Sequence, residues 1–197
     1  MVSNLSERLA NKLLSSSNVS EEARELYEYG LFILMSKLIF FVLACFFGLL
    51  FGCFTEAAIF YLAFMAIRQF AGGYHATTEI RCEIMSTTLF LICIAMIKLL
   101  KIHSFENAIA IATIAAASCI FLFCPIDTPE KPLSDNEYNS YRKISWIILL
   151  IILSIVFVSY LLKLRMFFIP TCLSLILESI LLIVGKIKKA LYKLISY

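Results

Sequence analysis

Six apolar runs without Asp, Glu, Lys or Arg recur along this chain of 197 residues. A helix that crosses a bilayer needs about 20 mostly apolar residues, so each run with its flanks predicts one membrane span. The runs are apolar on all sides, which argues against the alternating strands of a membrane barrel. The expected fold is therefore all-α and polytopic, with six spans. The runs are Leu38–Phe54, Ala57–Ile67, Ile84–Ile97, Ala108–Pro125, Ile144–Leu162 and Met166–Leu177.

The N-terminal segment has a different pattern, with Leu5, Leu9 and Leu13 repeating every fourth residue among polar neighbours. This spacing predicts a short amphipathic helix. It could lie flat on the membrane or pack on the protein's own cytosolic face. We expect a single domain made of an amphipathic surface helix at 1–19, a six-span core at 20–185 and a basic cytosolic tail at 186–197.

Composition agrees with a membrane protein. The chain is 61% hydrophobic and 16% charged, whereas a soluble domain carries about 25% charged residues. With a cytosolic N-terminus and six crossings, most Lys and Arg residues fall on the cytosolic side, as the positive-inside rule requires. Both termini are then cytosolic. The basic patch at Lys186–Lys193 suits an anionic inner leaflet, and it is too small to favour nucleic acid as a partner.

Seven cysteines are present, and their pattern predicts neither a disulfide scaffold nor a metal site. Five lie inside apolar runs, where a cysteine behaves as a small hydrophobe. Cys124 ends an apolar run. Cys82 differs, because it lies between Arg81 and Glu83 and seven residues after His75. We expect no cofactor and no metal.

His75 and Cys82 are the candidate catalytic residues. A neighbouring imidazole can remove a thiol's proton, and the thiolate can then attack a carbonyl. Seven residues of straight helix span about 10.5 Å, too far for a hydrogen bond. We therefore predict a bend at Gly72-Gly73 and a new helix capped at Thr77-Thr78. The alternative is that the His and the Cys are incidental.

The longest polar loop, from Cys124 to Ser134, contains three prolines. Ser134 and Glu137 have the spacing of a capping box, so a helix is expected to begin there. Lys131 could meet acidic groups of a peptide, although the loop could equally be an ordinary connection. Lys37 and Glu178 are the charges deepest in apolar sequence, and one possibility is that they pair with each other.

Two motifs in this order resemble the accessory gene regulator B (AgrB) family of membrane peptidases. The first is Arg68, Gly72-Gly73-Tyr74-His75-Ala76, Cys82 and Ser86. The second is Pro125, Lys131-Pro132-Leu133, Glu137 and Tyr141-Arg142-Lys143. The size and the six-span layout are also similar to the family.

The resemblance implies a cysteine endopeptidase of the bacterial cell membrane, with Cys82 as nucleophile and His75 as base at the cytosolic side. Its substrate would be an AgrD-like quorum-sensing propeptide with an acidic tail. Tail removal through a thioester and ring closure would give a thiolactone or lactone autoinducing peptide precursor. The implied substrate-binding residues are Arg68, Gly72, Gly73, Ser86 and Lys131. The resemblance also implies a homodimer. The rival functions are a small peptide transporter and a structural membrane subunit.

Overall fold

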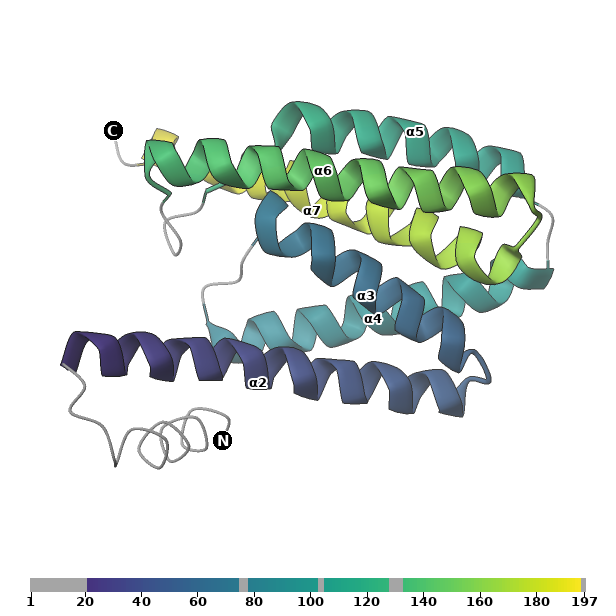
Figure 1. Ribbon diagram of the computed structural model, residues 1–197, viewed down its shortest axis with the longest axis horizontal. Helices are drawn as coiled ribbons and strands as arrows, with labels where there is room; N and C mark the ends of the chain where they lie inside the picture. Colours follow the sequence, from purple (N-terminus) through teal and green to yellow (C-terminus); the bar gives the residue numbers. More distant parts are fainter. Residues whose placement is uncertain (1–20, 75–77, 103–104, 128–132, 196–197) are drawn as a thin grey trace. The chain divides into compact units, whose positions relative to one another are not determined.

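The computed structural model describes residues 21–74, 78–102, 105–127 and 133–195. It divides into two compact units, Met1–Phe46 and Phe47–Tyr197. The described residues form helices and no named strand (Figure 1). The predicted surface helix at 1–19 lies outside the described residues. The helices are α2 (Glu21–Leu50), α3 (Phe54–Ala71), α4 (Glu79–Ile102), α5 (Glu106–Phe123), α6 (Asp135–Leu161) and α7 (Arg165–Ile195).

The expectation of an all-α, multi-pass membrane protein is confirmed. Among the described residues, five helices are long and apolar enough to cross a membrane. They are α2, α4, α5, α6 and α7, and α3 is not among them. Helix α3 has 18 residues, which at 1.5 Å per residue gives about 27 Å, slightly less than a bilayer core. The second of the six predicted crossings therefore stays a prediction.

Helix α2 carries most of the first unit. It is continuous from Glu21 to Leu50. In an apolar stretch of 18 residues within Tyr27–Leu50, 11% of the residues are buried. Large apolar side chains such as Leu34, Leu38 and Phe46 are exposed along it. Such a surface is stable in lipid, where apolar side chains need no protein cover.

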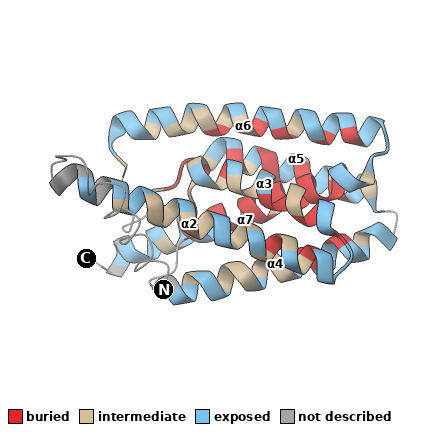
Figure 2. Cartoon of the chain, turned by 60° about the horizontal axis from the view of Figure 1, so that its bottom comes forward, coloured by how far each residue is buried: buried red, intermediate tan, exposed pale blue. Residues whose placement is uncertain are grey.

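Helix α7 is the centre of the second unit and packs against α3, α4, α5 and α6. In its apolar stretch 72% of the residues are buried, against 28% in α5 and in α6. Figure 2 shows buried residues concentrated on α3, α5 and α7, with exposed surface along the outer side of α6. The fully buried side chains of Phe60, Ile67, Leu175 and Leu182 belong to this core. A helix buried on most sides can carry polar residues that lipid would not tolerate.

Polar contacts join the helix ends that lie away from the Gly-Gly bend. Arg165 Nε lies 2.7 Å from Glu106 Oε1, and the Tyr160 hydroxyl donates to Asn107 Oδ1 at 2.9 Å. Lys101 of α4 pairs with Glu56 in the first turn of α3. Glu56 is 6% exposed. The acidic residue that lowers the hydropathy of α3 therefore has a cation from a neighbouring helix.

The predicted helix start at Ser134 is confirmed. Glu137 N–H donates to Ser134 Oγ at 3.4 Å, and Ser134 N–H donates to Glu137 Oε2 at 3.0 Å. This reciprocal pair is a capping box at the first turn of α6. It satisfies two backbone groups that the helix cannot pair itself.

We expect Ser134→Ala to lower the free energy of unfolding by about 1 kcal/mol, because the cap of α6 is lost. Unfolding in mixed detergent micelles with increasing dodecyl sulfate measures this change. Ser140→Ala is the control, since Ser140 is an exposed residue inside the same helix. The control should change stability by less than about 0.5 kcal/mol. Equal losses for the two variants would contradict the role of the cap.

Candidate active site

Helix α3 ends at the predicted bend. Gly72 and Gly73 have φ angles of 74° and 116°, a region that side-chain-bearing residues rarely adopt. The Gly72 N–H donates to the Arg68 carbonyl at 3.3 Å and closes the last turn. The chain then leaves the helix as an extended segment that contains Gly72, Gly73 and Tyr74.

This segment is held between the residues after α5 and helix α7. The Ile126 N–H donates to the Ala71 carbonyl at 2.9 Å, and Gly72 forms an isolated parallel bridge with Ile126. On the other side, the Tyr74 N–H donates to the Leu181 carbonyl at 3.0 Å. A methyl group on Gly185 would lie 2.7 Å from the Tyr74 nitrogen. Glycine at 185 thus permits the segment to approach the backbone of α7.

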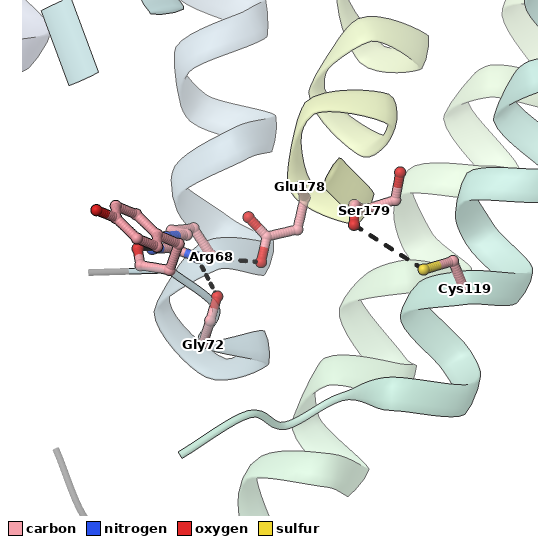
Figure 3. Close-up of polar contacts among 6 residues, drawn as sticks. Arg68, Gly72, Cys119, Glu178 and Ser179 are labelled. Carbon is pink, nitrogen blue, oxygen red and sulfur yellow. Dashed lines mark hydrogen bonds and ion pairs between the residues drawn. The ribbon is translucent and has the colours of Figure 1, made fainter. Parts of the chain in front are cut away.

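Arg68 binds the same segment from α3. Its Nη1 donates to the Gly72 carbonyl and its Nη2 donates to the Tyr74 carbonyl. Figure 3 shows the side chain reaching from α3 toward Glu178 on α7. Nη1 lies 3.7 Å from Glu178 Oε1, and the two side chains are 14% and 0% exposed, respectively.

Glu178 contacts Arg68, whereas the suggested pairing with Lys37 would join the two units and stays a prediction. Glu178 of α7 faces Arg68 of α3, and both helices belong to the second unit. The reason is geometric, because α3 packs directly against α7 and brings a guanidinium to the buried carboxylate.

Cys82 lies in the first turns of α4, which begins directly after Thr78. The Arg81 N–H donates to Thr78 Oγ1 at 3.4 Å, and the Cys82 N–H donates to the Thr78 carbonyl at 3.1 Å. The predicted cap is therefore confirmed for Thr78. Cys82 is half-buried, and Ser86 lies one turn later on the same face of the helix. The N-terminal turns of a helix favour negative charge, as a thiolate would need.

Two predicted site residues, His75 and Lys131, lie outside the described residues. The contact between His75 and Cys82 accordingly stays a prediction. The described chain ends at Tyr74 and resumes at Thr78, so both anchors of the short connection are placed. Arg68, Gly72, Gly73 and Tyr74 come together on one side of this connection, and Cys82 and Ser86 follow on the other.

The remaining cysteines lie in different environments. Cys53 and Cys124 are buried next to helix ends. Burial raises the pKa of both thiols, and the charge of Glu56 adds to the effect at Cys53. Raised pKa values leave less thiolate at neutral pH. No group of His, Cys, Asp and Glu suited to a metal ion occurs among the described residues.

The last turns of α7 reach the same region. Lys186 Nζ lies 3.6 Å from the Phe123 ring centre, and Lys188 Nζ lies 5.2 Å from that of Tyr74. Lys189 pairs with Asp127. Residues 186–195 continue α7 as helix, so the predicted basic tail begins inside this helix. The positive charges of this helix end lie next to Tyr74, which follows the bend, and next to Phe123 and Asp127 at the end of α5 and just after it.

Sequence reasoning missed Ile126, Leu181 and Gly185 as partners of the Gly-Gly segment. Ile126 and Leu181 bind through backbone atoms, which leave no trace in side-chain type. Gly185 gave a weak signal, as a small residue among Leu, Ile and Val in α7. Glu178 gave a stronger signal, as a lone charge in an apolar run, although its partner could not be read from the sequence.

The described helices and this charged centre define a polytopic, all-α membrane protein. The family model of accessory gene regulator B matches residues 6–182. The chain therefore belongs to the AgrB family, which supports a role in the processing of quorum-sensing peptides.

Individual relatives agree with the family match. An AgrB-like protein of Clostridium perfringens is 29% identical over 149 residues, which cover 73% of this chain and 69% of the relative. An AgrB-like protein of Listeria innocua is 30% identical over 142 residues, which cover 71% of this chain and 68% of the relative. No solved structure matches the chain.

We expect Gly72→Ala to destabilise the protein more than Gly52→Ala. Both glycines have positive φ angles, 74° and 68°, so each substitution carries a conformational cost of at least about 1 kcal/mol. A methyl group at Gly72 would also collide with the Ile126 carbonyl, whereas nothing lies within 4 Å of one at Gly52. Unfolding in mixed micelles should show an additional loss of roughly 1 kcal/mol or more for Gly72→Ala. Equal losses would mean that the close approach to Ile126 does not constrain the fold.

Proposed function

We propose that this protein is a membrane-embedded cysteine endopeptidase that removes the C-terminal tail of an AgrD-like quorum-sensing propeptide. Cys82 is the nucleophile and His75 is the general base. The observation that carries the proposal is the placement of the two anchors. Tyr74 is held on α7 and Arg68, and Thr78 caps the helix that bears Cys82. A connection of three residues limits the Cα separation of Tyr74 and Thr78 to about 14 Å, which is short enough for His75 and Cys82 to face the same space.

The reaction follows from the chemistry of the two side chains. His75 takes the thiol proton, and Cys82 Sγ attacks the carbonyl carbon that precedes the tail. The peptide C–N bond breaks, the tail amine receives the proton, and a thioester remains on Cys82. A Cys thiol or Ser hydroxyl inside the propeptide then attacks this thioester. A macrocyclic thiolactone or lactone forms, and Cys82 regains its proton.

Cyclisation competes with hydrolysis of the thioester. A nucleophile tethered to the same peptide has an effective molarity far above that of a free one. Exclusion of water from a site at the membrane edge would further slow hydrolysis. Both effects favour the ring over the linear acid.

Most of the predicted substrate contacts lie in the segments before Tyr74 and after Thr78. Gly72 and Gly73 stay predicted substrate contacts, although Gly73 is buried and Gly72 is half-buried against Ile126. Ser86 shares a helix face with Cys82. Lys131 and Arg68 stay predicted partners of an acidic tail, although the Arg68 guanidinium already binds protein groups. The basic residues at the end of α7 supply further positive charge next to Tyr74.

We place the protein in the bacterial cell membrane, with both termini and the active site on the cytosolic side. If α2 crosses the bilayer, α3 must return across it to bring the Gly-Gly bend to the side of the N-terminus. A homodimer is proposed from the family resemblance. A peptide transporter is less favoured, because it requires a continuous polar path, and the described helices are exposed largely through apolar side chains.

We expect Cys82→Ala and His75→Ala to lower the rate of tail release by roughly 10³-fold or more, because each removes one member of the dyad. The assay incubates purified protein in micelles with a synthetic propeptide that has an amphipathic helix, an internal Cys and an acidic tail. Mass spectrometry follows the tail and the cyclic product.

The matched control is Cys45→Ala, since Cys45 is also a partly buried, free cysteine. This variant should retain tail release within about twofold of the unmodified protein. Cleavage by Cys82→Ala at the unmodified rate would rule out the peptidase and favour a transporter or a structural subunit.

A further inference from the structure

We propose that Glu178 is a positioning residue that orients, through Arg68, the peptide group leading into His75. This inference rests on the proposed function and adds to it a residue from α7. The link runs from a buried carboxylate to a guanidinium, and from the guanidinium to two backbone carbonyls. Glu178 itself acts in this link only through Arg68.

The first step is the burial of Glu178. Its side chain is 0% exposed, in the most buried of the candidate spans. Ionisable groups at such depth are expensive and usually have a partner and a role. Among the described residues, the charged partner of Glu178 is Arg68. The carboxylate is therefore not an incidental surface charge.

The second step is the geometry of Arg68. The guanidinium is planar and holds its N–H groups in a fixed fork. Nη1, which faces Glu178, also donates to the Gly72 carbonyl, and Nη2 donates to the Tyr74 carbonyl. Attraction from Glu178 restrains this fork, and Figure 3 shows the contact between the two side chains. A neutral side chain of the same size would fill the space without this restraint.

The third step is covalent. The Tyr74 carbonyl belongs to the planar peptide group that joins Tyr74 to His75. Its oxygen is bound by Arg68, and the Tyr74 N–H is bound by the Leu181 carbonyl of α7. Leu181 lies less than one helical turn after Glu178. Helix α7 thus acts on both sides of Tyr74 and sets the direction in which the chain enters His75.

Alkylation of Cys82 by iodoacetamide tests this role without any propeptide. An ordinary thiol is only a few per cent thiolate at neutral pH, so loss of the His75 base should slow alkylation about tenfold or more at pH 7. Glu178→Gln should slow it by a comparable factor. In both variants the rate should rise more steeply with pH between about 6.5 and 8.5 than in the unmodified protein, because a thiol without its base depends on solvent hydroxide for deprotonation. Mass spectrometry of the Cys82 peptide gives each rate.

Two controls separate positioning from stability. Glu56→Gln removes the other buried, paired glutamate of the described chain, at the far end of α3, and should leave the Cys82 profile unchanged. Cys93 and Cys172 are 6% and 0% exposed and report unfolding, because their alkylation requires the core to open. In Glu178→Gln their rates should stay at the unmodified level while that of Cys82 falls.

A double variant covers the case in which a single substitution prevents folding. Arg68→Met leaves a buried, uncompensated carboxylate and should lower the melting temperature, whereas Arg68→Met with Glu178→Gln removes both charges and should recover it. Alkylation of Cys82 should stay slow in the double variant, because the fork is absent. Recovery of both properties together would show that the pair only stabilises the fold, and would overturn the proposal.

The remaining outcomes also test the positioning role of Glu178. Alkylation of Cys82 at the unmodified rate in Glu178→Gln overturns the positioning role, provided that His75→Ala slows it. Faster alkylation of Cys82, Cys93 and Cys172 together assigns Glu178 to stability alone and likewise overturns it. Unchanged alkylation in His75→Ala would refute the dyad itself, and the role of Glu178 would fall with it.

Discussion

The ion pair between Arg68 and Glu178 is the interaction on which the arrangement of this site depends. Both side chains lie in the protein interior, at 14% and 0% exposure, where water cannot solvate an isolated charge. Each charge therefore requires the other, and this requirement fixes α3 against α7. The same guanidinium binds two carbonyls beyond the end of α3. The buried ion pair thereby also restrains the backbone that precedes His75.

The central position of α7 makes this arrangement possible. Helix α7 packs against α3, α4, α5 and α6, so it can carry Glu178 among apolar neighbours without exposing it to lipid. Helix α3 is as long as the candidate span α5, at 18 residues, and its two charges meet partners on other helices: Glu56 pairs with Lys101, and Arg68 with Glu178. Hydropathy alone can fail to identify such a helix as a membrane span, because its polar side chains contact protein in place of lipid.

Two segments far apart in the chain meet at the bend. Gly72, a residue of the first motif, pairs with Ile126, which directly follows Pro125 of the second motif. Backbone atoms make this contact, through the isolated bridge and the hydrogen bond from the Ile126 N–H to the Ala71 carbonyl. The proposed function gives a reason for the proximity, because a peptidase that processes a propeptide needs a site bordered by several segments. The basic end of α7 lies beside the same segments and extends the positive charge around them.

The sequence by itself determined the class of fold and most local features. Long uncharged runs predicted membrane helices, positive-φ glycines were expected at 72 and 73, and the caps at Thr78 and Ser134 followed from short-range rules. These features depend on neighbours a few residues apart, so a linear pattern contains them. The motifs also singled out His75 and Cys82, whose contact remains a prediction.

Only the tertiary structure decided which distant groups meet. The sequence suggested Lys37 as a partner for Glu178, and the packing of α3 on α7 brings Arg68 to this carboxylate. The backbone partners Ile126 and Leu181 could not be inferred, because every residue offers the same amide and carbonyl. Pairings of this kind depend on which helices touch and at what register. Neither can be inferred from the composition or from the spacing of residues along the chain.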